Sequence, residues 1–402
     1  MSDVPLLRFP EFTDEWKESV LSDFVERVKR KNKNNLCKLP LTISAQYGLV
    51  DQISFFNKVI ASENMSNYYL LHKGDFAYNK SYSSEYPWGA IKRLDCYEQG
   101  TLSSLYICFK PYSHVSSDFL THYFETSKWH QGISEIAVEG ARNHGLLNVG
   151  IQDFFETRHC LPQSLLEQEK IAKFLNLIEE RIATQNKIIE KYESLIQAMC
   201  DTLIESEQHK VELAFSDFGK SYSGLSGKSA EDFGEGCPYI TYMNVYQNQI
   251  INATNVGLVK INGAEQQSVV HYGDILFTLS SETAEEVGIG AVYLGDTYPL
   301  YLNSFCFGIH IIDDNKIFPP FLAFYVSTKS FRKVVFPLAQ GSTRFNLQKN
   351  DFMKKGFSFP TVERQRKIYS ALKTYSDKLA VEKSIAKLLC KQKNHLLSKL
   401  FI

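Results

Sequence analysis

The sequence predicts an α+β protein built as a pseudo-twofold repeat, in which a mixed globular segment and a long helix are followed by a second such pair. Three observations support this fold. Two segments of about forty residues carry apolar side chains every three or four positions, as amphipathic helices do. Short alternating apolar runs, typical of strands, lie outside them. Several motifs also recur in order at an offset of about two hundred residues.

The two long helices are the clearest elements. The first is expected at 165–205, contains no Gly or Pro, and follows Pro162 at a position where helix starts tolerate proline. The second is expected at 362–400, with Glu382 and Lys393 interrupting its apolar stripe. Each would be about 60 Å long. We expect the two stripes to pair as an antiparallel coiled coil; the alternative is that each stripe packs on its own globular domain.

Matching motifs indicate that one half of the chain duplicates the other. Both long helices begin with a Pro, a short spacer and Gln-x-Lys-Ile. The other matched pairs are His72–Phe76 with His271–Ile275, Leu102–Leu105 with Leu302–Phe305, Phe119–Leu120 with Phe321–Leu322, Gly140–Arg142 with Ser342–Arg344, and Asn148 and Asp153 with Asn346 and Asp351.

Each globular half mixes strands with short helices. Helices are expected at Ser117–Trp129 and Pro320–Val335. Strands are expected at Phe76–Tyr78, Leu105–Phe109, Ile275–Leu279, Gly288–Leu294 and Phe305–Ile312.

The composition narrows the class of protein. A net charge of -1 argues against a free-standing nucleic-acid binder with a strong positive field, although local patches or a partner can supply charge. We assign the 28 Phe and 22 Tyr first to core packing and only second to base stacking. The eight cysteines form no CxxC pair and are expected to be buried thiols. Without a signal peptide or membrane-spanning run, a cytoplasmic protein is expected.

A search for catalytic motifs finds only partial matches. Ser226–Ser229 resembles the end of a phosphate-binding loop but lacks its upstream Gly. Phe318–Phe321 resembles the Asn/Asp-Pro-Pro-Tyr/Phe loop of amino-methyltransferases, but Phe318 cannot accept the required hydrogen bonds. The Gly pair at 288–290 is too weak for a cofactor loop, and the ten histidines show no HExxH spacing. We therefore expect no catalytic residue, no cofactor and no metal.

Polar clusters remain where the two halves match. Asn, Lys, Arg, Ser and Thr are the side chains that contact base edges and phosphates. Each cluster alone is more typical of a solvated loop, but recurrence favours DNA contact. The candidate DNA-binding residues are Lys29, Arg30, Lys31, Lys33, Asn79, Lys80, Ser81, Lys92, Arg93, Arg142, Asn143, His144, Thr278, Ser280, Ser281, Thr283, Thr343, Arg344 and Asn346.

With these motifs the chain resembles the specificity subunit of type I restriction–modification enzymes over essentially its whole length. Each motif alone is weak, but together they are specific. The resemblance rests on Leu7–Phe12 with Glu15–Trp16, on Gly74–Ser81, on Tyr86–Lys92, on Gly273–Thr278 with Ser280–Thr283, and on the Gln-x-Lys-Ile helix starts.

The resemblance implies a non-catalytic subunit that reads a split, asymmetric site in double-stranded DNA. Residues 1–162 and 207–360 would be two target recognition domains, 163–206 the central conserved helix and 361–402 the C-terminal conserved helix, and the two helices would hold the domains apart. Two modification subunits, which bring S-adenosylmethionine and methylate adenine, and restriction subunits would dock on this frame. The docking residues it suggests, at the helix starts, are Gln168, Ile171, Phe174, Gln365, Ile368 and Leu372.

A second interpretation is an interaction scaffold with a coiled-coil arm and two protein-binding domains. A cytosolic enzyme with an unrecognised site is a third, disfavoured because the acidic residues are dispersed. Binding of labelled DNA in the presence of a modification subunit distinguishes the first two.

Overall fold

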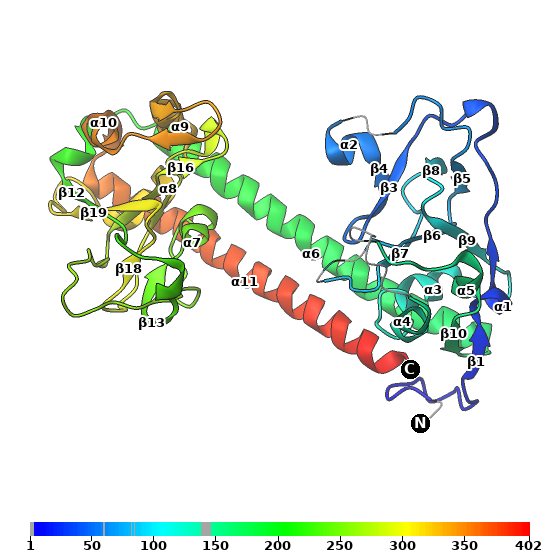
Figure 1. Ribbon diagram of the computed structural model, residues 1–402. Coiled ribbons are helices and arrows are strands. Elements are labelled where there is room, and N and C mark those ends of the chain that lie inside the picture. Colours follow the sequence, from blue (N-terminus) through cyan, green and yellow to red (C-terminus); the bar gives the residue numbers. More distant parts are fainter. Residues whose placement is uncertain (1–3, 59–60, 82, 84, 138–145) are drawn as a thin grey trace. The chain divides into compact units, whose positions relative to one another are not determined.

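The computed structural model describes residues 4–58, 61–81, 83, 85–137 and 146–402. The chain forms two compact units: unit 1 comprises residues 1–185 and 385–402, and unit 2 comprises residues 186–384. Each unit contains one globular domain and a part of both long helices (Figure 1). The division therefore falls within the helices and not at their ends.

Unit 1 contains a four-stranded antiparallel sheet in the order β2-β9-β6-β7, and three two-stranded sheets, β3-β4, β5-β8 and β1-β10. Its elements before the first long helix are β1 (Lys17–Val20), α1 (Leu21–Phe24), β2 (Val25–Arg27), η1 (Lys33–Asn35), β3 (Leu41–Ser44), β4 (Gly48–Asp51), α2 (Gln52–Phe56), β5 (Tyr69–His72), β6 (Phe76–Asn79), β7 (Ala90–Arg93), β8 (Gln99–Leu102), β9 (Ile107–Pro111), α3 (Ser117–Tyr123), α4 (His130–Ile136), α5 (Ile151–Phe155) and β10 (Arg158–Leu161).

Unit 2 repeats the four-stranded sheet as β12-β19-β15-β17 and adds the sheets β14-β13-β18, β16-β21-β20 and β11-β22. Its elements are β11 (Lys210–Ala214), η2 (Phe215–Asp217), β12 (Gly219–Ser223), η3 (Ala230–Asp232), β13 (Phe233–Ile240), α7 (Tyr242–Gln247), β14 (Gly257–Val259), β15 (Ile275–Thr278), β16 (Ser280–Ser281), η4 (Ala284–Glu286), β17 (Gly290–Val292), β18 (Tyr301–Leu302), β19 (Cys306–Ile311), α8 (Pro319–Tyr325), α9 (Lys329–Val335), η5 (Phe336–Leu338), β20 (Ala339–Gln340), β21 (Phe345–Leu347), α10 (Lys349–Lys354) and β22 (Gly356–Pro360).

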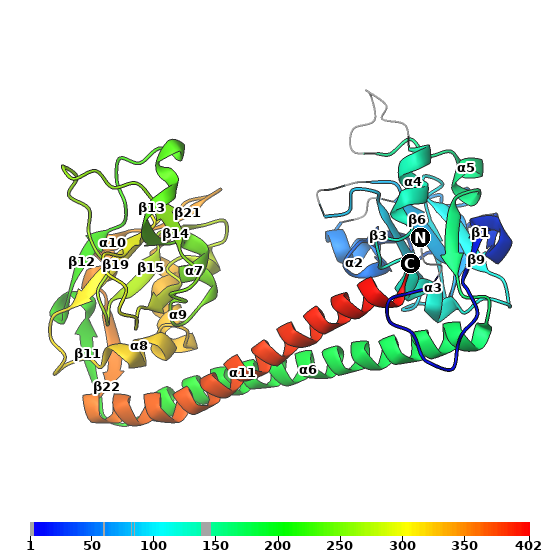
Figure 2. The ribbon, with the colours of Figure 1, turned by 90° about the horizontal axis from the view of Figure 1, so that it is seen from below.

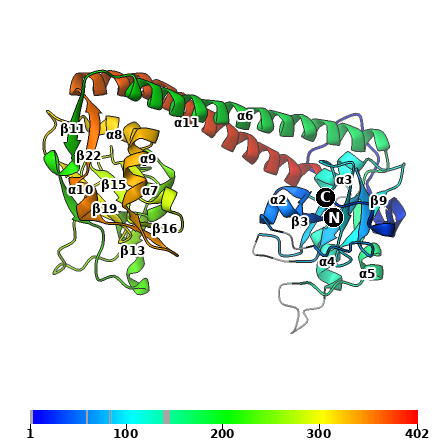
Figure 3. The same cartoon turned by 90° about the horizontal axis from the view of Figure 1, so that it is seen from above.

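The long helices α6 (Leu165–Glu205) and α11 (Val362–Leu400) have the predicted bounds. They run antiparallel, because the start of α6 and the end of α11 share unit 1 while the end of α6 and the start of α11 share unit 2. In unit 1 Lys393 forms an ion pair with Glu179 at 2.6 Å. In unit 2 Lys383 forms one with Glu193 at 2.6 Å. Figure 3 shows β11 and β22 side by side where α6 ends and α11 begins.

The helix stripes also join the core of each unit. In unit 1 Ile171 of α6 and Leu400 of α11 are buried in one cluster with Phe119. Figure 2 shows the C-terminal end of α11 reaching the globular domain of unit 1. In unit 2 Ile196 and Leu372 are buried with the phenylalanines of the four-stranded sheet. The helices thus pair with each other and pack on the globular domains, so the two arrangements that the sequence left open occur together.

The two shorter predicted helices are wrong in extent, because the helix that begins each segment stops well before the predicted end. Within segment 117–129 only α3 is helical, and α4 begins after it at His130, whereas segment 320–335 is divided into α8 and α9. Thr328 causes the break in unit 2: its hydroxyl donates to the Tyr325 carbonyl at 2.7 Å and accepts the Phe331 N–H at 3.3 Å. Thr126 makes the matching bond to the Tyr123 carbonyl in unit 1. A threonine that bonds nearby backbone groups ends one helix and begins the next.

A repeated Gly-Asp turn begins the central strand of each four-stranded sheet. Gly74 and Gly273 have φ of 91° and 87°, which L side chains rarely adopt. The aspartate that follows each glycine accepts the backbone N–H of the histidine three residues earlier, at 2.8 Å in both units. The recurring motif is therefore a backbone turn that one carboxylate closes.

The abundant phenylalanines fill the two cores. Phe76, Phe109 and Phe119 in unit 1 are at most 1% exposed, and Phe277, Phe307 and Phe352 in unit 2 are fully buried. Their burial accounts for the aromatic content through packing, as the composition suggested. Among the described residues, no helix is both long and apolar enough to span a bilayer.

Candidate nucleic-acid interface

The structure of unit 2 brings two of the predicted polar clusters together. The segment after β15 forms β16, and β16 pairs with β21 so that Ser280 lies opposite Asn346 and Ser281 opposite Phe345. Thr278 and Ser280–Ser281 come from one cluster, and Thr343–Asn346 from the other. Residues separated by about sixty positions thus form one surface, which we call the unit 2 loop pair (residues 278–283 and 341–346).

Neighbouring side chains hold the first strand of the unit 2 loop pair in place. Tyr242 donates its hydroxyl to the Ser280 carbonyl at 2.8 Å. Glu286 accepts hydrogen bonds from the hydroxyls of Tyr246 at 2.7 Å and Ser281 at 3.2 Å. The bond from Tyr246 lowers the pKa of Glu286, which keeps this carboxylate ionised as an acceptor.

Arg332 fixes the turn that follows the loop. Its guanidinium donates to the carbonyls of Glu285 at 2.6 Å, Val287 at 2.7 Å and Gly288 at 2.9 Å. Burial lowers the pKa of Arg332, but a guanidinium stays charged at neutral pH. One side chain therefore satisfies three backbone acceptors, and the loop has a defined shape without a ligand.

The exposed side of the unit 2 loop pair carries Thr283, Thr343, Arg344 and Asn346. The Arg344 guanidinium lies over the Phe305 ring, 5.6 Å from its centroid. Gly341 permits the tight turn that precedes Arg344. Its φ is 137°, and a Cβ atom on residue 341 would lie 2.1 Å from the Arg344 carbonyl oxygen. By contrast Thr278, Ser280 and Ser281 are at most 7% exposed, so they shape the loop from inside.

In unit 1 the segment that follows β6 likewise pairs with a distant segment of the chain. Ser81 forms an isolated antiparallel bridge with Leu146, and the Leu147 N–H donates to the Lys80 carbonyl at 2.9 Å. Asn79 accepts the Ser81 N–H at 3.0 Å through its side chain. We call residues 79–81 and 146–147 the unit 1 loop pair. The candidates Arg142, Asn143 and His144, which directly precede its second segment, lie outside the described residues.

Lys92 and Arg93 do not lie with the unit 1 loop pair. β7 runs antiparallel to β6, so Arg93 is opposite Phe76, at the start of β6, while Asn79 is at its end. Lys92 is ion-paired with Glu125, and Arg93 with Asp95 at 2.7 Å and with Asp118 at 2.6 Å. The structure gives both cations intramolecular partners within the domain.

The basic run at residues 29–33 is also partly engaged within unit 1. Arg30 forms an ion pair with the buried Asp75, in the Gly-Asp turn before β6. Lys31 donates to the Asn67 carbonyl at 2.9 Å and lies over the Tyr69 ring, 3.7 Å from its centroid. Lys29 and Lys33 are exposed.

Most of the predicted docking residues lie inside the chain's own core. Gln168, Ile171, Gln365, Ile368 and Leu372 are at most 3% exposed, and Phe174 is partly buried. Gln168 accepts the Ser116 N–H and donates to the Pro162 carbonyl, both at 2.8 Å. Gln365 makes the same two bonds, to Phe318 and Pro360, again at 2.8 Å. Their observed role is to tie each long helix to its domain.

Three buried thiols have the properties of core residues and not of nucleophiles. Burial raises the pKa of Cys108, Cys200 and Cys306 to about 12. The thiolate is the reactive form of cysteine, and at neutral pH these groups are almost entirely protonated.

Sequence reasoning missed the residues that support the unit 2 loop pair. Tyr242, Tyr246 and Arg332 lie outside the matched motifs, and their role depends on long-range contacts with the 280–288 segment. Gly341 precedes the matched Ser342–Arg344 and was the available signal for a tight turn at that place.

The comparisons with known proteins agree with this architecture. Residues 216–389 match the family model of the type I restriction modification DNA specificity domain. The comparison with curated proteins gave no significant match.

Two solved structures have the same fold as the whole chain. One is the type I restriction-modification system S subunit from M. genitalium, at 16% identity and a TM-score of 0.53, covering 99% of both chains. The other comes from a study of complex assembly and conformational transition of the type I R-M system, at 16% identity and a TM-score of 0.56, covering 96% of this chain and 97% of that chain. The predicted resemblance to type I specificity subunits is thereby confirmed: residues 216–389 match the family model, and the whole chain has the fold of these solved structures.

Proposed function

We propose that this chain is the DNA-specificity subunit of a type I restriction–modification enzyme, in which each unit reads one half of a split, asymmetric site in double-stranded DNA. The observation that carries the proposal is the recurrence of the loop pair at the same place in both units, with different side chains. A common frame with different surface residues is what two readers of two different sequences require.

The proposal assigns DNA contact to the exposed members of the loop pairs. In unit 2 these are Thr283, Thr343, Arg344 and Asn346. In unit 1 they are Asn79, Lys80 and Ser81, together with Arg142, Asn143 and His144. Arginine and asparagine form paired hydrogen bonds with guanine and adenine edges, and all of these types contact phosphate. Lys29 and Lys33 are kept as phosphate contacts.

The long helices serve in this proposal as spacer and docking surface. Two modification subunits and the restriction subunits would dock on them in the cytoplasm, and the modification subunits would share the phosphate contacts that a chain of net charge -1 needs. Because the predicted docking residues are buried, the exposed apolar side chains of the helices are better candidates. In unit 1 these are Leu166, Leu177 and Leu388, at 71%, 55% and 65% exposed.

The experiment measures DNA binding by the chain assembled with its modification subunit. We expect Arg344→Ala to weaken binding of a labelled duplex that carries the target by about 1–3 kcal/mol, or roughly 5- to 150-fold. Lys355→Ala is the matched control, because Lys355 is an exposed cation of unit 2 that follows α10, outside the loop pair. Equal affinities of the two variants would remove Arg344 from the interface.

A further inference from the structure

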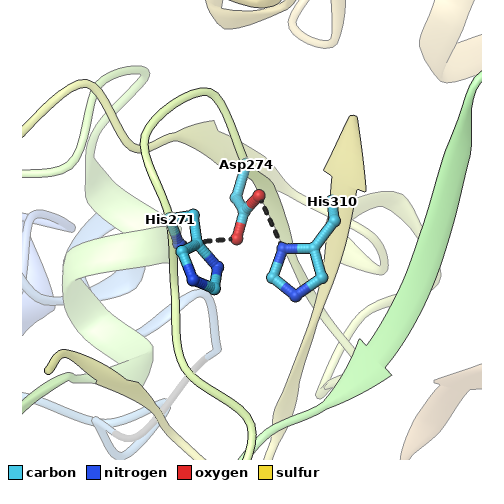
Figure 4. A group of neighbouring side chains, drawn as sticks. All are labelled: His271, Asp274 and His310. Carbon is cyan, nitrogen blue, oxygen red and sulfur yellow. Dashed lines mark hydrogen bonds and ion pairs between the residues drawn. The ribbon is translucent and has the colours of Figure 1, made fainter. Parts of the chain in front are cut away.

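Three side chains of unit 2 meet at the Gly-Asp turn. His271 precedes the turn, Asp274 closes it, and His310 reaches it from β19 (Figure 4). Each offers one ligand atom, a ring nitrogen or a carboxylate oxygen, and these atoms all lie within 4.8 Å of one another. Two imidazoles and a carboxylate form a donor set suited to Zn²⁺ and other divalent transition metals.

The cluster contains a buried carboxylate without a permanent cation among its hydrogen-bond partners. Asp274 is 2% exposed. One carboxylate oxygen accepts the Tyr222 hydroxyl and the His271 backbone N–H, both at 2.8 Å, and the other lies 2.9 Å from Nδ1 of His310. No lysine or arginine is among these partners. A buried carboxylate is costly unless a cation balances it.

In unit 1 the equivalent buried aspartate has a permanent cation beside it. The equivalent Asp75 is ion-paired with the Arg30 guanidinium, which is charged at every relevant pH. The residue of unit 1 that corresponds to His310 is Lys110, on β9. Lys110 forms an ion pair with Glu26 at 3.1 Å. The cationic side chains beside Asp75 are therefore permanent ones, and unit 1 has no need of a bound cation.

The geometry in unit 2 leaves room for a cation. The His310 ring is held by stacking on Tyr222, with centroids 4.2 Å apart. His271 is exposed, and its ring centroid is 4.9 Å from that of His310. Tetrahedral zinc with ligands at about 2.0–2.2 Å separates ligand atoms by about 3.5 Å. The ligand atoms lie within 4.8 Å of one another, so the widest separation must shorten by about 1 Å, and rotation of the exposed His271 side chain can supply this movement.

From this geometry and this missing charge, we propose that His271, Asp274 and His310 bind one Zn²⁺ ion. The ion supplies to Asp274 the positive charge that Arg30 supplies to Asp75, and it ties β19 to the Gly-Asp turn. Lys220 lies opposite His310 in β12, but it is exposed, so water and salt screen its charge. The site is at the start of β15, whereas the unit 2 loop pair follows its end, so zinc stabilises unit 2 without touching the proposed DNA surface.

The test uses the full chain without an affinity tag, stripped of metal with a chelator. Titration with Zn²⁺ is expected to give one bound ion per chain and a melting temperature that rises with zinc concentration. His271→Gln is expected to weaken zinc binding at least tenfold and to leave the metal-free melting temperature unchanged, because the side chain is exposed. His72→Gln, the matched change in unit 1, leaves zinc binding unchanged.

His310→Arg provides an independent arm, since it places a permanent cation beside Asp274 as in unit 1. It is expected to abolish zinc binding while the metal-free chain stays folded. The absorption spectrum of a Co²⁺ complex separates nitrogen and oxygen ligands from thiolates. Zinc affinity that is equal in the parent, His271→Gln and His310→Arg, or a thiolate spectrum, would overturn the proposal, as would an absence of micromolar binding. None of these results depends on DNA binding.

Discussion

Unit 1 and unit 2 close the same backbone turn but surround it with different groups. In both units the aspartate of the turn accepts the N–H of a histidine three residues earlier. That aspartate is ion-paired with Arg30 in unit 1, whereas in unit 2 its carboxylate lies 2.9 Å from Nδ1 of His310. Burial raises the pKa of Asp75, while the His72 N–H and Arg30 act to lower it. The backbone bonds are therefore the repeated part of the fold, and the groups that face the aspartate differ around them.

A second pair of equivalent positions differs in the same way. Tyr123 of unit 1 and Tyr325 of unit 2 are both buried. The Tyr123 hydroxyl lies 2.9 Å from Nδ1 of His159, whereas the Tyr325 hydroxyl donates to the Ser358 carbonyl at 3.0 Å. The residue of unit 2 that corresponds to His159 is the buried Phe357. Unit 1 thus buries a titratable ring where unit 2 buries an apolar one.

The largest expected effect tests whether the buried glutamine at the start of each long helix stabilises its unit to the same extent. Gln168→Ala and Gln365→Ala each remove a buried amide that bonds one N–H and one carbonyl of its domain. An unsatisfied buried group costs about 1–3 kcal/mol, so each variant is expected to lose about 2–4 kcal/mol of unfolding free energy. Urea unfolding measures both losses.

The control for the amides is Gln131→Ala, an exposed glutamine of α4, which is expected to change stability by less than about 0.5 kcal/mol. Because all three tryptophans, Trp16, Trp88 and Trp129, lie in unit 1, their fluorescence follows that unit while circular dichroism follows the whole chain. If only one of the two glutamine variants lost unfolding free energy, the two glutamines would not have equivalent roles.

A somewhat smaller effect concerns the stability of the folded chain at low pH. Burial lowers the pKa of His159 to about 3, so the folded chain keeps this ring neutral while the unfolded chain protonates it below about pH 6.5. Stability is therefore lost as the pH falls from about 6.5 towards 3, by about 1.4 kcal/mol per pH unit. At pH 4.5 the loss from this ring is roughly 2–3 kcal/mol. Unit 2 has Phe357 instead and lacks this contribution.

His159→Gln is expected to remove most of that acid sensitivity from unit 1, because an amide does not titrate. Tryptophan fluorescence during urea unfolding at pH 7 and pH 4.5 measures the difference. His130 on α4, which is less buried and whose pKa burial also lowers, serves as the comparison in His130→Gln. An unchanged acid dependence in His159→Gln would assign the sensitivity to other groups.

The sequence was sufficient for the elements whose periodicity is long or repeated. The bounds of α6 and α11 were predicted correctly because some forty residues contribute to each pattern. Most of the short strands were not predicted, since three- or four-residue strands such as β2 and β14 carry too little periodicity. The division of helices at Thr126 and Thr328 depends on one side chain each, which a periodic pattern does not resolve.

For the site, the sequence located loops but not the contacts among them. The duplication marked both segments of each loop pair, because matched positions stood out from their surroundings. It did not distinguish exposed Arg344 from buried Thr278, nor anticipate that Lys92 and Arg93 form ion pairs with acidic residues of the domain. It also gave no metal spacing, because His310 lies far along the chain from His271 and reaches it only through the sheet. Long-range pairing decides each of these outcomes.

In the proposed function each unit reads one half of a split DNA site. The most direct test maps methylated adenines across the genome of a host that expresses the chain with its modification subunit, once with the parent sequence and once with Thr343→Ala/Arg344→Ala. We expect a motif in two parts separated by unread bases, with only one part relaxed or lost in the variant. A single continuous motif, or a variant in which both parts change equally, would contradict it.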